Sequence, residues 1–320
     1  MGESSRRCRE DQQREYVMTD IVAVSTSSFA KEGSRPLEML RDAGFEVRLN
    51  PHGRTLTVDE ARAHLSGVIG LVAGTEKLGG ELLRECSALK CISRVGVGID
   101  AIDLKAASEL GIAVKNTPEA HVDAVAELAL AGILALFRKL PQSDASIRAG
   151  KFEKPMGRLL RGKTIGFVGF GRVARALSAL VAPFGVEQIA SDVVRGDGVR
   201  YVELDELMAR ADVVTLHVPY SKSVHNLIGE AQLARMKPDA VVVNTARGGL
   251  IDEAALHRHL AANPRAGAYL DCFEKEPYTG ELAKLPNIVV TAHIGSYARE
   301  ARVRMETEAV ENLLRALGRA

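Results

Sequence analysis

Short apolar runs alternate with polar or helix-patterned stretches along most of the chain, and they fall into two successive sets. The runs are rich in Val, Ile and Ala and are nearly continuous, which is typical of parallel strands covered on both faces. Two such sets predict an α/β chain with two doubly wound parallel-sheet domains. The first set lies at 20–25, 45–49, 67–73, 89–93 and 112–114; the second lies at 163–171, 186–191, 212–219, 240–246, 266–271 and 287–293.

The six runs of the second set match the strand count of a dinucleotide-binding sheet. Between the sets, residues 128–137 (LALAGILALF) are too few to span a bilayer and predict a helix buried between domains or subunits. Residues 143–163 are rich in Arg, Lys and Gly and predict a surface connection. The amphipathic pattern of 301–320 predicts a helix that returns to the first domain, which would then be discontinuous.

Composition excludes several classes of protein. The 320 residues carry a net charge of +1 and no Trp, so neither a basic surface for nucleic acid or membranes nor an aromatic stacking platform is expected. The 4 cysteines lack CxxC spacing and predict reduced thiols in a cytoplasmic protein, with no metal site. Residues 1–16 have no apolar signal-peptide core and are predicted to be a flexible N-terminal extension.

A glycine-rich turn opens the second set. Gly169-Phe-Gly171 closes one strand and leads into a helix, so that backbone N–H groups and the helix dipole would face a pyrophosphate. Ala174 takes the place of a third glycine and is small enough for the helix to pack on the strand. Asp192 ends the next strand, where a carboxylate accepts hydrogen bonds from the adenosine ribose and repels a 2′-phosphate. NAD is therefore favoured over NADP, although Arg195 lies three residues further on.

The stretch VVVNTARGGLID (241–252) ends an apolar strand with a charged residue, Arg247, and two glycines. A guanidinium at such a position needs an anionic partner. Glu276 and His293 follow the next two strands, and ligands of open α/β sheets bind at the carboxyl ends of the strands. The arginine could hold a substrate carboxylate, the histidine could exchange a proton with a hydroxyl, and the glutamate could orient the histidine. Each residue alone could be structural; their joint placement predicts catalysis.

Several long motifs carry a family resemblance. They include SRVGVGIDAIDLKAASELGIAVKNTP, GKTIGFVGFGRVARAL, VNTARGGLIDEAAL, GAYLDCFEKEP and TAHIGS. From about residue 20 to 315 the chain resembles the D-isomer-specific 2-hydroxyacid dehydrogenases, and most of all their phosphoglycerate dehydrogenase branch without its C-terminal regulatory domain. The resemblance implies an NAD-binding Rossmann domain at 119–296, inserted in a flavodoxin-like substrate-binding domain at 17–118 plus 297–320, and a homodimer.

The resemblance also implies residue roles. Arg247 matches the substrate-binding arginine, Glu276 the carboxylate paired with histidine, and His293 the acid/base. The expected NAD-binding residues are Gly169, Gly171, Arg172, Val173, Asp192, His217, Pro219, Thr245, Asp271 (beside the nicotinamide carboxamide) and Gly295. The expected substrate-binding residues are Gly74, Thr75, Gly96, Val97, Gly98 and Arg247.

The substrate remains open at this point. We expect 3-phosphoglycerate and 3-phosphohydroxypyruvate first, with phosphate-binding cations among Lys77, Arg94 and 148–163, and glyoxylate or hydroxypyruvate as the alternative. A different class, an NAD-sensing transcriptional corepressor, shares the catalytic residues but would carry long disordered tails. A relative of formate dehydrogenase is disfavoured because Glu276 stands where those enzymes have glutamine.

Overall fold

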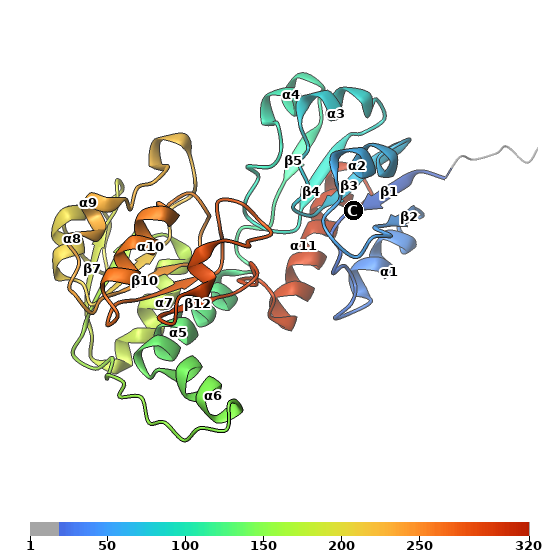
Figure 1. The fold of residues 1–320 in the computed structure, drawn as a ribbon. Coiled ribbons are helices and arrows are strands. Elements are labelled where there is room, and N and C mark those ends of the chain that lie inside the picture. The colour runs from blue at the N-terminus through green and yellow to red at the C-terminus, as the bar shows by residue number, and fades with distance from the viewer. Residues whose placement is uncertain (1–18, 320) are drawn as a thin grey trace, which may run out of the picture. The chain divides into compact units, whose positions relative to one another are not determined.

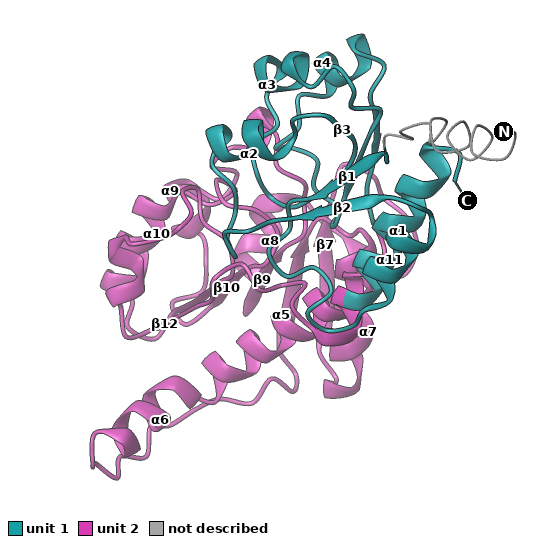
Figure 2. Ribbon diagram, turned by 90° about the vertical axis from the view of Figure 1, so that its right-hand side faces the viewer, with its two compact units in different colours: residues 1–117, 303–320 teal, residues 118–302 magenta. Residues whose placement is uncertain are grey.

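The computed structural model describes residues 19–319, and the chain divides into two compact units (Figures 1 and 2). Unit 1 comprises the described residues up to Thr117 and those from Val303 onward, and unit 2 comprises Pro118–Arg302. The boundary at which the chain returns from unit 2 to unit 1 falls inside helix α11 (Arg299–Ala316), whereas the sequence placed it between residues 296 and 297. The expected N-terminal extension, 1–16, lies outside the described residues.

Unit 1 is built on a five-stranded parallel sheet with strand order β2-β1-β3-β4-β5. This order is that of the flavodoxin-like fold, and its direction reverses between β1 and β3. The strands are β1 (Ile21–Val24), β2 (Glu46–Leu49), β3 (Val68–Ala73), β4 (Cys91–Arg94) and β5 (Ala113–Lys115); the helices between them are α1 (Arg35–Asp42), α2 (Val58–His64), α3 (Gly80–Glu85) and α4 (Leu104–Glu109).

Helix α11 supplies the last layer of unit 1. Its buried Ala309 and Leu313 face the sheet, and the Ser93 hydroxyl on β4 donates to the Ala309 carbonyl over 2.6 Å. Gly70 on β3 makes room for the helix, since a Cβ there would lie 3.1 Å from a Leu313 methyl. The amphipathic C-terminal pattern therefore buries its apolar face on the first sheet of the chain.

Unit 2 contains a seven-stranded parallel sheet in the order β12-β11-β10-β9-β6-β7-β8. The predicted fold class, two doubly wound parallel sheets, is confirmed. The strands are β6 (Thr164–Val168), β7 (Glu187–Ser191), β8 (Arg200–Tyr201), β9 (Val213–Leu216), β10 (Val241–Asn244), β11 (Gly267–Leu270) and β12 (Ile288–Val290); the helices are α5 (Val122–Phe137), α6 (Leu140–Arg148), α7 (Arg172–Val181), α8 (Leu204–Arg210), α9 (Glu230–Leu233) and α10 (Glu253–Ala262).

The sequence missed the edge strand β8 because its two residues, Arg200 and Tyr201, carry no apolar run. The expected surface connection was also partly wrong, since α6 continues to Arg148 before irregular chain begins. The apolar helix is α5, and it lies against the sheet of unit 2: Gly132 touches the Tyr269 ring so closely that a Cβ would stand 2.0 Å from it. Within residues 19–319 no helix combines the length and apolarity needed to cross a membrane.

Candidate active site

The glycine turn between β6 and α7 is shaped for a phosphate. Gly169 adopts a left-handed φ of +85°, and a Cβ there would stand 2.7 Å from a Val218 methyl. Around Gly171, by contrast, a Cβ would meet nothing within 4 Å, so this side of the turn is open. Arg172 begins α7, whose first N–H groups therefore face the same opening. The backbone fits an anion at the position that the motif predicted.

Asp192 lies directly after β7 and braces this turn. One carboxylate oxygen accepts from the Phe170 amide over 2.7 Å, and the other accepts from the Val194 amide over 3.0 Å. Each oxygen keeps a second lone pair for a ribose hydroxyl. The aspartate therefore links the phosphate turn to the position expected for the adenosine ribose.

Three further residues expected at the cofactor follow β9 and β10. Burial lowers the pKa of His217 to about 3, so its ring is neutral at pH 7; its Nε2 lies 2.9 Å from the Thr215 hydroxyl. Pro219 follows two residues later. The Thr245 hydroxyl is buried and has no hydrogen-bond partner within the described part of the chain. An orphaned hydroxyl at a strand end is a group that a bound nucleotide would satisfy, so the residues present fit NAD.

The turn that carries Arg247 is held by the buried side chain of Asn244, the last residue of β10. Its amide nitrogen donates to the Arg247 carbonyl over 2.7 Å, and its oxygen accepts from the Ala246 amide over 3.0 Å. The Arg247 guanidinium in turn donates to the Ala246 carbonyl over 2.7 Å. Sequence reasoning missed Asn244, although a polar residue closing a valine strand was a usable signal.

The two glycines after Arg247 are explained by what lies beside them. A Cβ on Gly248 would stand 2.0 Å from the Phe273 carbonyl carbon, so only glycine lets the two backbones touch. Gly249 has a left-handed φ of +76°, and a Cβ there would lie 2.9 Å from the Tyr220 ring. The turn carrying the arginine therefore lies directly against the loop that follows β11.

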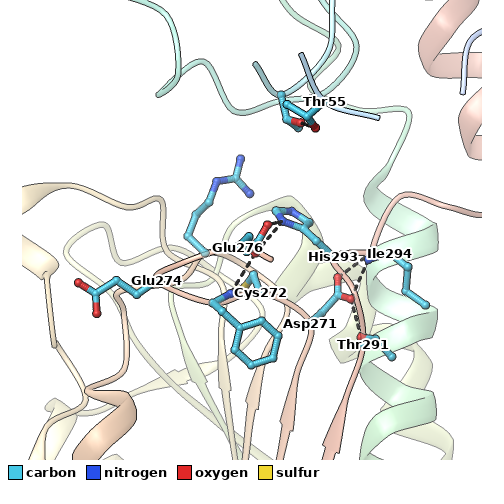
Figure 3. Close-up of polar contacts among 12 residues, drawn as sticks. Thr55, Asp271, Cys272, Glu274, Glu276, Thr291, His293 and Ile294 are labelled. Atoms are coloured by element: carbon cyan, nitrogen blue, oxygen red, sulfur yellow. Dashed lines mark hydrogen bonds and ion pairs between the residues drawn. The ribbon is translucent and has the colours of Figure 1, made fainter. Parts of the chain in front are cut away.

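That loop carries Glu276, which pairs with His293. The two carboxylate oxygens lie 3.1 and 3.0 Å from the histidine Nδ1 (Figure 3), and Phe273 N–H donates to one of them over 3.0 Å. Burial acts to raise the pKa of Glu276, but the hydrogen bond and charge of His293, with the charge of Arg247, lower it below its usual value. Glu276 is therefore ionised at neutral pH, and both side chains remain about two-fifths exposed.

His293 itself stands in a strained left-handed conformation with φ +55°. The buried carboxylate of Asp271 holds its turn: one oxygen accepts from Thr291 Oγ1 (2.5 Å) and from Ile294 N–H (2.8 Å), and the other accepts from Gly295 N–H (2.7 Å) (Figure 3). Asp271, expected beside the nicotinamide, thus supports the histidine turn in this structure. Thr291, quoted only within a motif, was missed as part of this network.

Arg247, Glu276 and His293 follow β10, β11 and β12, which are consecutive neighbours in the sheet of unit 2. The charge of Arg247 acts on Glu276, and Glu276 bonds to His293. The structure therefore brings the three predicted catalytic residues together. The Arg247 guanidinium lies close enough to Glu276 for its charge to act there, and Glu276 fixes Nδ1 of the His293 imidazole, which leaves Nε2 for proton exchange.

The expected substrate-binding turns follow β3 and β4, neighbouring strands of unit 1. The Gly74 N–H donates to the Ser25 hydroxyl over 2.9 Å, and the Gly96 N–H donates to Thr117 Oγ1 over 2.8 Å. Both amides therefore already have partners within unit 1. Thr75 is exposed, with its hydroxyl 3.0 Å from that of Thr55, and Asn116 donates to the Val97 carbonyl over 2.8 Å, one residue before Gly98.

Cysteines and metals add little to the site. Cys272 is buried, and burial together with the nearby Asp271 charge raises the pKa of its thiol, which makes it unreactive. Over residues 19–319, no group of three or more His, Cys, Asp or Glu side chains is arranged to hold a metal ion.

Comparisons with known proteins identify similar chains. Residues 130–295 match the family described as D-isomer specific 2-hydroxyacid dehydrogenase, NAD binding domain. A glyoxylate reductase of Thermococcus litoralis is 40% identical over 256 residues, which cover 75% of this chain and 77% of that protein. A D-3-phosphoglycerate dehydrogenase of Archaeoglobus fulgidus is 41% identical over 258 residues, 76% of this chain but 48% of that protein, so the chain spans about half its length.

Among solved structures, the TT0316 protein of Thermus thermophilus superposes with a TM-score of 0.87 and 35% sequence identity. The match covers 94% of this chain and 97% of that one. Similarity therefore extends over both units and not only over the nucleotide-binding part.

Proposed function

The chain belongs to the D-isomer specific 2-hydroxyacid dehydrogenase family, whose members are NAD-dependent oxidoreductases acting on CH–OH groups, and we propose that it reduces a small, unphosphorylated 2-keto acid of the glyoxylate and hydroxypyruvate class. The observation that carries this proposal is the Glu276–His293 pair beside Arg247 in the sheet that also forms the glycine turn. That sheet combines a carboxylate-binding cation, a proton donor and a nucleotide site.

In the proposed reaction the Arg247 guanidinium holds the substrate carboxylate and polarises the adjacent carbonyl. NADH, which the glycine turn at Gly169 and Gly171 would hold, would supply the hydride. His293 Nε2 gives its proton to the carbonyl oxygen as it becomes the hydroxyl, and the ionised Glu276 stabilises the charged imidazole before transfer. Asp271 and Thr291 keep the imidazole in place by fixing its turn.

NAD is the proposed coenzyme, held by the turn at Gly169, Gly171, Arg172 and Val173, by Asp192, and by the orphaned Thr245 hydroxyl. Arg195 was the residue that could have favoured NADP. Its guanidinium pairs with Glu203 over 2.6 Å, which supports NAD because a 2′-phosphate would compete with that carboxylate.

Phosphoglycerate dehydrogenase activity, our first expectation from the sequence, is kept as the second candidate. The identity with the Archaeoglobus fulgidus protein and the exposed Lys77 beside Thr75 support it. Against it, the Arg94 guanidinium already donates to the Val95 carbonyl beside its own strand end. A phosphate dianion needs several charge-assisted contacts, and a single exposed lysine supplies one.

A panel assay with glyoxylate, hydroxypyruvate and 3-phosphohydroxypyruvate, each with NADH and NADPH, tests this assignment. We expect kcat/KM with NADH to be at least about tenfold higher for an unphosphorylated acid than for 3-phosphohydroxypyruvate. A tenfold difference corresponds to about one charge-assisted contact. The control is His293→Gln, which keeps the turn but removes the acid. Preference for 3-phosphohydroxypyruvate would instead support the second candidate, and tight NADH binding without turnover would support an NAD-sensing corepressor.

We also propose a homodimer formed through unit 2. Helix α6 and the irregular chain after it extend away from the sheet of that unit (Figures 1 and 2), and they carry large apolar side chains that are mostly exposed. These side chains are Leu140 (56%), Ile147 (53%), Phe152 (80%), Met156 (90%) and Leu159 (68%). Exposed apolar groups gathered in one segment are typical of a surface covered by a partner. In the homodimer that the family resemblance implies, that partner is a second copy of this chain.

Sedimentation velocity tests the dimer. Phe152→Asp combined with Met156→Asp should convert a dimer to a monomer, whereas Val58→Asp, an exposed apolar position of α2 in unit 1, should not. A wild-type chain that sediments as a monomer would contradict the proposal.

A cytoplasmic location is proposed as well, on the ground that Cys86, Cys91 and Cys272 are all unpaired thiols.

A further inference from the structure

A buried carboxyl group lies beneath one of the two substrate-binding turns of unit 1. Glu76 belongs to the turn after β3, between the exposed Thr75 and Lys77, yet its own side chain is only 3% exposed. The turn stands where the strand order of unit 1 reverses, between β1 and β3, which is the place where open α/β sheets bind ligands. A carboxyl group at this position is unexpected in a site meant for an anion.

The contacts of Glu76 tie it to that turn. Its Oε1 accepts the hydroxyl proton of Ser25, the residue after β1, and the same Ser25 oxygen accepts the Gly74 N–H over 2.9 Å. Its Oε2 has no hydrogen-bond partner within residues 19–319. A Cβ on Gly74 would stand 2.9 Å from that oxygen, so the backbone of the turn lies directly upon the carboxyl group.

The charges around Glu76 are few. Burial raises the pKa of Glu76. The hydrogen bond from Ser25, the backbone N–H groups of Glu76 and Gly74, and the charge of Arg94 at the end of β4 only partly oppose this. Lys77, the next residue in the turn, is exposed to solvent. On α2, His64 bonds the Val24 carbonyl beside Ser25, and burial lowers the pKa of that imidazole, which is therefore neutral at pH 7. Without a direct ion pair, a buried carboxylate is costly.

We propose that Glu76 is a positioning residue held as an uncharged carboxylic acid, which fixes the Gly74 turn through Ser25 without placing a negative charge beneath the substrate anion. This inference rests on the proposed function, because it takes the anionic end of a 2-keto acid to bind at that turn. An ionised Glu76 would repel the same anion. Substrate affinity is therefore set by the fraction of Glu76 that is protonated.

The test compares the wild-type enzyme with Glu76→Gln, which keeps the shape but cannot ionise. KM for glyoxylate and hydroxypyruvate is measured with NADH from pH 6 to 9.5. His293 is present in both proteins, so its contribution cancels in the ratio of the two KM values. We expect that ratio, wild type over variant, to rise with pH toward a limit of about tenfold per pH unit as the protonated fraction falls. A ratio independent of pH overturns the proposal if the stability difference between the two proteins, described next, is also independent of pH.

A second measurement does not depend on catalysis. A carboxyl group whose folded pKa is raised stabilises the fold fully below its unfolded pKa and loses that contribution as pH rises toward the folded pKa. Wild type should therefore lose thermal stability relative to Glu76→Gln between about pH 4 and the folded pKa. A stability difference that does not change with pH would show that Glu76 is ionised in the fold and would overturn the inference even if neither keto acid is a substrate.

Glu81→Gln is the matched control, since Glu81 is an exposed glutamate on α3 of the same unit and undergoes the same replacement away from the Gly74 turn. Its KM ratio to wild type should not depend on pH. If wild type reduces neither keto acid, the proposed function fails, while the stability comparison still reports the charge state of Glu76. The two failures are thus distinguishable.

Discussion

The two sheets of this protein are alike in construction and different at their strand ends. Both are parallel and both end their strands in short turns. After β10, β11 and β12 of unit 2 those turns present partly exposed ionisable side chains, namely Arg247, Glu276 and His293. After β3 of unit 1 the acidic side chain is buried: Glu76 lies under its turn, between the exposed Thr75 and Lys77, and its hydrogen bond runs inward to Ser25.

This difference shows how one architecture supports two tasks. Proton transfer needs an ionisable side chain that can reach the substrate, so unit 2 exposes its ionisable groups. Unit 1 is proposed to hold the substrate anion, which needs the absence of repelling charge, and its acid, Glu76, is buried beneath the Gly74 turn. Substitution of Glu276 or His293 should therefore change the rate, whereas substitution of Arg247 or Glu76 should change substrate affinity.

Removing the imidazole of His293 should have the largest effect. His293→Gln is expected to lower kcat about 10²- to 10⁴-fold, the usual contribution of a positioned acid, while the Kd for NADH stays within about twofold, because the nucleotide turn is formed by other strands. Stopped-flow turnover and NADH fluorescence titration measure the two quantities. Equal loss of NADH binding would mean that the histidine turn supports the nucleotide site instead.

Arg247→Ala should be next in size. Loss of the guanidinium removes the contact to the substrate carboxylate, and kcat/KM for keto acids should fall about 10²- to 10³-fold. Arg265→Ala, an exposed arginine beyond α10, is the control that removes one positive charge elsewhere in unit 2. Unchanged turnover in Arg247→Ala would remove the residue from the site.

Asp192→Ala should alter coenzyme choice without touching the chemistry. Removing the carboxylate takes away its repulsion of a 2′-phosphate, and the preference for NADH over NADPH in kcat/KM should narrow by about 10- to 100-fold. Glu203→Gln, which frees Arg195, should add to this effect. An NADH preference that survives both changes would place the ribose contact on another residue.

The contact between the Arg247 turn and the loop carrying Glu276 can be tested through Gly248. Gly248→Ala inserts a methyl group against the Phe273 backbone and should lower the free energy of unfolding by about 1–3 kcal/mol. Gly79→Ala, where a Cβ would meet nothing within 4 Å, should stay within about 0.5 kcal/mol of wild type. Thermal unfolding monitored by circular dichroism separates the two; equal stability would mean that the loop shifts freely.

The smallest effect concerns pH and the Glu276–His293 pair. Because the pKa of Glu276 is lowered in the fold, its stabilising contribution is present above the unfolded pKa and is lost as pH falls through the folded pKa. As pH is lowered from above the unfolded pKa to below the folded pKa of Glu276, wild type should thus lose more stability than Glu276→Gln. The pair is two-fifths exposed, so the difference should be small. Parallel unfolding curves at all pH values would indicate that the pair does not stabilise the fold.

Much of this fold could be predicted because its signals are local. Continuous apolar runs mark buried parallel strands, and they located all described strands except β8. The two residues of β8, Arg200 and Tyr201, do not form such a run. The glycine turn and Asp192 were recognisable from their spacing. Asn244 and Thr291 were harder. Asn244 acts through a hydrogen bond to the Arg247 turn, and Thr291 acts through a hydrogen bond to the carboxylate of Asp271, which follows a neighbouring strand.

The sequence by itself determined the strand pattern, the nucleotide turn and the three chemical groups that follow consecutive strands, because periodicity and motif spacing are properties of the chain. Only the tertiary structure decided that Gly248 touches the Phe273 backbone, that Asp271 holds the His293 turn, and that Glu76 is buried beneath Gly74. These three facts depend on which strands become neighbours and on what is then excluded from water. Burial shifts the pKa of a carboxyl group, and the sequence alone does not show which carboxyl groups are buried.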